Sequence, residues 1–111
     1  MNRLPMTSAA SALLRALLAR AGEQRSRILL SDWTTTDWQS LTFVGERHRV
    51  GLVVSGPQPL HMAEQWAAGL PEAEFDLGSA GFVAEIALRE PPALRDDGCV
   101  LVQLEALTIA D

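Results

Sequence analysis

The stretch that most constrains the fold is residues 40–54, with the sequence SLTFVGERHRVGLVV. Strand-like runs at 40–44 and 49–54 flank a polar group, which predicts a β-hairpin with its turn at Gly45–His48. Pairing the runs about this turn places four apolar side chains on one face, in two cross-strand pairs: Phe43 with Val50 and Leu41 with Leu52. A slip of one residue would place Phe43 opposite a charged residue or a glycine, so the pattern predicts this register.

An amphipathic helix precedes the hairpin. Thr7 or Ser8 suits its N-cap and Gly22 suits the position after its last turn, which predicts a helix over residues 8–21. Leucines at helical spacing form its core-facing stripe, namely Leu13, Leu14, Leu17 and Leu18. The polar segment 23–27 predicts a linker, and Ile28–Leu30 predicts a short strand.

The second half of the chain also alternates between helical and strand-like patterns. Residues 59–70 predict a helix with an apolar stripe of Leu60, Ala63, Ala67 and Leu70, and Trp66 flanks this stripe. Residues 82–88 alternate as a strand with one buried face, and Pro91-Pro92 ends that pattern. A turn at 96–98 leads to a last strand over 99–109, whose change of apolar phase indicates a bulge near Glu105-Ala106.

This order of elements predicts a two-layer α+β sandwich. Each helix is amphipathic and each hairpin has one apolar face, so both helices should pack on one face of a mostly antiparallel sheet of about four or five strands. A length of 111 residues suits a single domain over residues 1–111. The sequence has no Gly-rich phosphate loop and no βαβ series that would indicate a nucleotide site.

Charge is distributed unevenly along the chain. All 9 basic residues are arginine, and with 14 acidic residues the formal net charge is −5, which disfavours a nucleic-acid coat protein. Residues 1–27, Arg3 among them, carry a net charge of +4, and the remaining residues carry −9. This asymmetry suits either packing of the first helix on an acidic sheet or head-to-tail association of subunits.

Targeting and redox signals are weak. Arg15 interrupts the Ala- and Leu-rich N-terminal segment, and no apolar run approaches the ~20 residues of a membrane span. We therefore expect a cytoplasmic-type protein that does not contact membranes. The single Cys99 cannot form an intramolecular disulfide, and without a neighbouring base we expect an inert, half-buried thiol.

Catalytic and metal-binding patterns are weak as well, so we expect no enzymatic activity and no cofactor. Asp32-Trp33 and Asp37-Trp38 repeat a dipeptide, but a spacing of five puts the two carboxylates on opposite faces of a strand. We expect His48 to lie in an exposed turn, without the further ligands that a metal site needs. A metal-assisted hydrolase that uses Asp32, Asp37 and His48 ranks third among the functional hypotheses.

Several runs resemble one known family in their order along the chain. These are LLSDW at 29–33, DW at 37–38, TFVGERHRV at 42–50, AEQWAAGL at 63–70, RDDG at 95–98 and LEALT at 104–108. Together they resemble the tail completion, or tail terminator, family of long-tailed bacteriophages and gene transfer agents. The stretch before Leu29 is shorter than in that family and lacks its proline, which is typical of a shortened relative such as a gene transfer agent component.

The resemblance implies a structural protein of a phage-like particle. Copies of the chain would form a closed ring, six-fold by this resemblance, that caps the tail tube and joins it to the head. Its partners would be itself, the tube and the head–tail connector, with no sequence-specific nucleic acid. It would be cytoplasmic during assembly and then part of the particle.

Residue types and positions indicate which side chains could form the interface of this assembly. Aromatic and arginine side chains are favoured at interface cores, so the candidates include Trp33, Trp38, Arg47 and Arg49. His48 joins them because the predicted turn at Gly45–His48 would be exposed and could reach a neighbour. The alternative is a stand-alone α+β binding or regulatory module without catalytic activity. The two-layer architecture and the acidic charge motivate that alternative.

Overall fold

A five-stranded antiparallel sheet organises the chain in the computed structural model, which describes residues 6–111. Residues 1–5, Arg3 included, lie outside the described part. The strands follow the order β1-β2-β5-β3, and β4 pairs with β5 beyond the end of β3. In chain order the elements are α1 (Ser8–Arg20), η1 (Gly22–Arg27), β1 (Ile28–Gln39), β2 (Val44–Val54), α2 (Pro59–Ala67), η2 (Leu70–Glu72), η3 (Gly78–Ala80), β3 (Phe82–Leu88), β4 (Ala93–Leu94) and β5 (Val100–Ile109).

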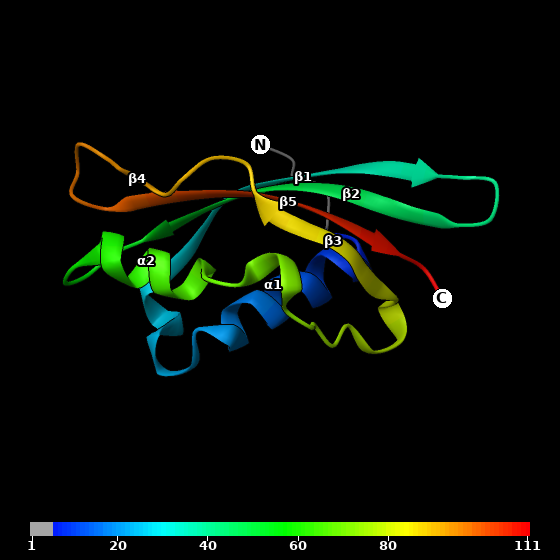
Figure 1. Ribbon diagram of the computed structural model, residues 1–111, viewed down its shortest axis with the longest axis horizontal. Helices are drawn as coiled ribbons and strands as arrows, with labels where there is room; N and C mark the ends of the chain where they lie inside the picture. The colour runs from blue at the N-terminus through cyan, green and yellow to red at the C-terminus, as the bar shows by residue number, and fades with distance from the viewer. Residues whose placement is uncertain (1–5) are drawn as a thin grey trace.

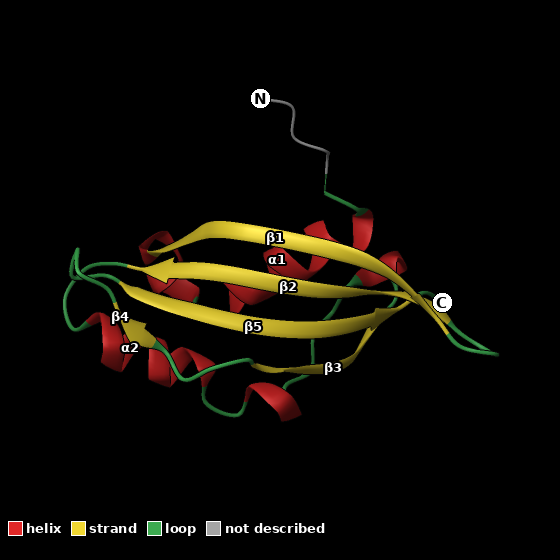
Figure 2. Cartoon of the chain, turned by 90° about the horizontal axis from the view of Figure 1, so that it is seen from above, coloured by secondary structure: helices red, strands yellow, loops and turns green. Residues whose placement is uncertain are grey.

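Both α-helices and the short 3-10 turns lie on one face of the sheet (Figures 1 and 2). The predicted two-layer α+β sandwich is therefore confirmed. Between the layers, alternate residues of β2 and β5 meet the apolar stripe of α1, and the fully buried side chains here include Leu13, Leu17, Leu52, Val54, Val102 and Leu104. We call this side of the sheet the core face and the opposite, uncovered side the open face.

Local sequence sets the limits of α1 as predicted. The Thr7 hydroxyl accepts a hydrogen bond from the Ala10 amide at 3.1 Å, which caps the first turn. Gly22 follows the helix with a φ of +58°, a conformation that costs glycine little. At the same end the Arg20 guanidinium donates to the carbonyl of Trp66 at 3.0 Å, which ties α1 to the last turn of α2.

The first hairpin forms, but the predicted turn and register are wrong. The strand β1 is 12 residues long, and the turn lies at residues 40–43 rather than 45–48. Val50 pairs with Trp33 instead of Phe43, because the β-branched and aromatic residues of 33–38 favour a strand. Gly45 belongs to β2, where its missing side chain allows close approach of β5: an added Cβ would lie 2.0 Å from the Thr108 carbonyl oxygen.

Corrections in the second half are smaller. The helix α2 ends at Ala67 rather than at residue 70. Leu70 is buried as predicted, but it belongs to the following 3-10 turn η2. The predicted bulge in the last strand is absent, since β5 pairs with β2 without interruption; the irregularity lies in β3, between Val83 and Glu85. Leu107 is buried although it points to the open face, because side chains of the neighbouring strands cover it.

Candidate functional site

A buried histidine lies at the centre of the sheet's core face. His48 sits in the middle of β2, opposite Thr35 on β1 and Ala106 on β5, and its side chain is fully buried. The expectation of an exposed turn histidine is wrong, because the segment 45–48 is part of a central strand. A buried imidazole requires polar partners, and β1, β2 and β5 supply them.

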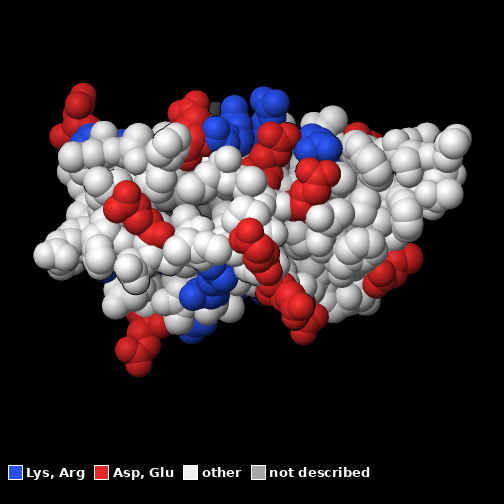
Figure 3. Space-filling model, viewed as in Figure 1, with Lys and Arg blue, Asp and Glu red and all other residues white. Residues whose placement is uncertain are grey.

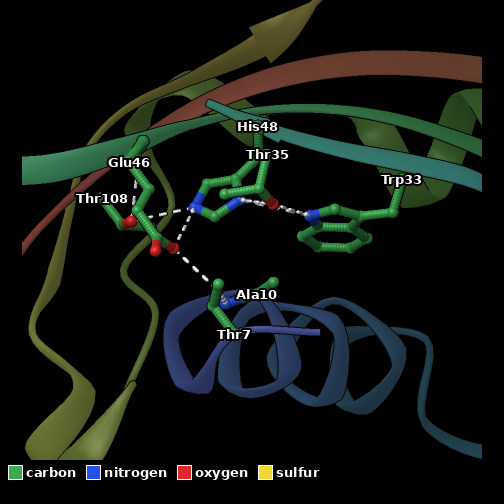
Figure 4. Close-up of polar contacts among 7 residues, drawn as sticks. All are labelled: Thr7, Ala10, Trp33, Thr35, Glu46, His48 and Thr108. Carbon is green, nitrogen blue, oxygen red and sulfur yellow. Dashed lines mark hydrogen bonds and ion pairs between the residues drawn. The ribbon is translucent and has the colours of Figure 1, made fainter. Parts of the chain in front are cut away.

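Both ring nitrogens of His48 are hydrogen-bonded (Figure 4). Nδ1 lies 3.1 Å from the indole nitrogen of Trp33 and 3.1 Å from the Thr35 hydroxyl. The Trp33 indole N–H can only donate, and it lies 3.1 Å from the Thr35 hydroxyl oxygen as well as from Nδ1, so the two acceptors share it. With Nδ1 accepting, the neutral ring carries its proton on Nε2, which lies 2.9 Å from the Thr108 hydroxyl and donates to it.

Glu46 links this histidine to the first helix. One of its carboxylate oxygens accepts a hydrogen bond from the Thr7 hydroxyl at 2.7 Å and lies 3.8 Å from Nε2 of His48. Because the same Thr7 hydroxyl caps α1, a continuous set of polar contacts runs from the sheet into the helix N-terminus. We call these residues the polar cluster: Thr7, Trp33, Thr35, Glu46, His48 and Thr108.

Burial lowers the pKa of His48, and the nearby Glu46 carboxylate opposes that shift. The ring is therefore neutral at neutral pH. Every buried side-chain nitrogen and oxygen within residues 6–111 has a hydrogen-bond partner. With both nitrogens engaged and the ring inaccessible to solvent, His48 holds three strands in register and offers no free position to a substrate.

The three residues of the hydrolase hypothesis do not converge. Asp32 lies over Gly51 on the open face, whereas Asp37 pairs with Glu46 and lines a hollow of about 330 Å³ on the core face. Among residues 6–111, no three His, Cys, Asp or Glu side chains are grouped so that they could hold a metal ion.

The five candidate interface residues divide between the two faces of the sheet. Trp33 and His48 belong to the polar cluster, where the two rings meet edge to face at 5.6 Å. Trp38, Arg47 and Arg49 alternate with them in the strands and therefore lie on the open face. Arg47 forms an ion pair with Glu105 of β5 at 3.5 Å.

The turn of the first hairpin is a second candidate site that the sequence analysis missed. The Ser40 hydroxyl accepts from the Phe43 amide at 3.1 Å, and the Ser40 amide donates to the Phe43 carbonyl at 2.9 Å. This closed turn holds Leu41 fully exposed and leaves 52% of Phe43 accessible. We call residues 40–44 the hairpin tip; its sequence signal is the run 38–45, which contains no charged residue.

Charged side chains are absent from the projecting hairpin end in Figure 3, where the surface over this end of the sheet is white.

Two arginines of the basic N-terminal part have structural roles on the helix side of the sheet. Arg20 and Arg27 donate to backbone carbonyls of Trp66 and Ser55, so these arginines tie loops together rather than meet acidic side chains of the sheet.

Comparison with protein-family models, with curated proteins and with solved structures gave no match for this chain. Within residues 6–111, no helix combines the length and the apolar character needed to cross a membrane.

Proposed function

We propose that this chain is a tail terminator, or tail completion, protein of a phage-like particle. In this role, copies of the chain assemble into a ring at the end of the tail tube and join it to the head. The observation that carries the proposal is the hairpin tip, an apolar projection closed by hydrogen bonds between Ser40 and Phe43 and left uncovered on the isolated chain. An exposed apolar patch is typical of a protein–protein contact.

The ordered motif series supports the same role, and several of its residues now have physical tasks. Arg47 and Arg49 lie on the open face, where a neighbouring subunit or the tube can reach them. Trp33 and His48 join β1 to β2 beneath these arginines, and in assembly they act as positioning residues. The proposal assigns no catalytic step and no sequence-specific contact with nucleic acid, and it places the protein in the cytoplasm during assembly and then in the particle.

Electron microscopy of particles made without the protein tests this role. Deletion of the gene in a host that produces the particles should give overlong or headless tails, because tube growth is no longer stopped and capped. Expression of the wild-type chain from a second copy should restore normal tails. Normal tails in the deletion strain would rule the proposal out.

A second candidate function is a non-catalytic binding or regulatory module. A surface hollow of about 430 Å³ beside the edge strand β3 favours it, because charged side chains of Arg47, Glu85 and Arg89 line that hollow. A small polar ligand that fits there should raise the melting temperature of the wild-type protein and have little effect on an Arg89→Ala variant. Equal shifts in both proteins would argue against binding at this hollow.

A further inference from the structure

We propose that the hairpin tip of one subunit docks on an apolar row at the far end of the next subunit's open sheet face. The row consists of residues that face one another across four strands: Leu29, Val53, Leu101 and Ala93. We call it the end row. The inference deepens the proposed function, on which it rests for the expectation that this chain assembles with its own copies.

Along the strands, the open face changes from an apolar row to polar and charged rows and back to an apolar row. The apolar end row lies where β1 begins and β2 ends, and Leu29 within it is 63% exposed. Next come polar and charged rows that include Asp32, Arg49 and Glu105. At the other end the face becomes apolar again, at Trp38 and Ile109, and continues into the hairpin tip.

The two apolar ends lie at opposite ends of the sheet. Figure 1 shows the β1–β2 hairpin projecting at one end, whereas β4 and the start of α2 lie at the other. The long axis of the molecule is 45 Å, so the hairpin tip cannot reach the end row of its own chain. A second copy placed head to tail can cover both, since every subunit then presents its tip to one neighbour and its end row to the other.

Charge favours this arrangement over face-to-face packing of two sheets. The tip carries no charge, and the charged side chains that border the end row, such as Asp32 and Arg89, are exposed and stay at its rim. Full face-to-face packing would bury the charged middle rows, which costs free energy unless every charge is paired. The tip therefore suits an apolar surface that is narrow and lies at an end of the sheet.

The contact is small, which sets the expected behaviour in solution. The tip and the row each offer only a few side chains, so one contact buries less than the ~1,200 Å² of a stable protein pair. Single contacts are therefore weak, and closure of a ring, in which each subunit makes two of them, stabilises the assembly. We expect mostly monomers in dilute solution and oligomers at high concentration or on the tube end.

Cysteine cross-linking tests this contact directly. In a Cys99→Ser background, the double variant Leu41→Cys/Leu29→Cys should give, on oxidation at high protein concentration, a ladder of covalent dimers, trimers and larger species. Each single-cysteine variant should stay largely monomeric, because a head-to-tail contact never brings two equivalent positions together. The matched control Leu41→Cys/Thr34→Cys, with its second thiol among the polar rows, should give no ladder.

Three outcomes would overturn the contact: no ladder from the double variant, an equal ladder from the Thr34 control, or efficient dimers from Leu41→Cys alone. Melting temperatures equal to that of the wild type show that the variants fold. If the Cys99→Ser protein does not fold, Cys99→Ala provides a background that is equally free of the native thiol. The test is separate from that of the proposed function. Overlong tails in the deletion strain without a ladder would refute only the contact, and a ladder with normal tails would refute only the tail role.

Discussion

Acidification should destabilise this protein through His48, whose pKa in the folded chain lies below its ordinary value. The folded state holds the ring neutral, because Nδ1 accepts a hydrogen bond from Trp33 and burial lowers the pKa below the ordinary value of 6.5. In the unfolded chain the same ring binds a proton near pH 6.5. The contribution of the neutral His48 to the free energy of unfolding is therefore fully present above that pH. It declines as the pH falls from about 6.5 toward the lower pKa of the folded state.

The size of the effect follows from the difference in bound protons. If His48 stays neutral in the folded state, the unfolded chain gains about one extra proton between pH 7.5 and pH 5.5. The free energy of unfolding then falls by about 1.4 kcal/mol over this range. This value is an upper limit, because the Glu46 carboxylate at 3.8 Å partly restores the affinity of the ring for a proton.

Urea unfolding at pH 5.5, 6.5 and 7.5 measures this loss, with circular dichroism as the signal. The control is His48→Gln, whose amide can accept from Trp33 and donate to Thr108 but does not titrate. Its free energy of unfolding should change much less across the range, while the exposed His61 remains in both proteins. Parallel pH profiles for wild type and His48→Gln would refute the neutral, buried ring.

Other substitutions test neighbouring parts of the structure. Thr7→Ala should cost about 1 kcal/mol of stability, because α1 loses its cap, whereas Thr7→Ser keeps the hydroxyl and should cost little. Gly45→Ala should cost about 3 kcal/mol of stability or more, since the new Cβ would meet the carbonyl oxygen of Thr108 in β5. The matched change Gly22→Ala adds a Cβ that meets no atom within 4 Å, so it should cost only about 1 kcal/mol, for the positive φ. Trp66→Phe should cost about 1–2 kcal/mol by removing the buried indole bond to the Leu17 carbonyl. Thermal and urea unfolding measure the stability lost in each of these variants. A reversed order within the Thr7 pair or within the glycine pair would contradict the contacts described.

The sequence by itself determined the parts that depend on local signals. A capping threonine, a leucine stripe and a glycine in the left-handed region define α1 without reference to the rest of the chain. Alternation and the following prolines placed the strand at Phe82–Leu88, and the order of the elements was enough for the α+β class. Each of these signals acts over a few residues, so no tertiary information is required.

The tertiary structure alone decided where the first hairpin turns and which residues it buries. The segment 45–48 is polar, and only pairing of β2 with β5 as well as β1 makes it a central strand. His48 can be buried there because Trp33, Thr35 and Thr108 converge on it from positions 13 to 60 residues away. The same pairing moves the turn to residues 40–43 and leaves Leu41 exposed. Hydrogen-bond partners so far apart in sequence leave no local pattern, which is why the candidate site depends on the fold.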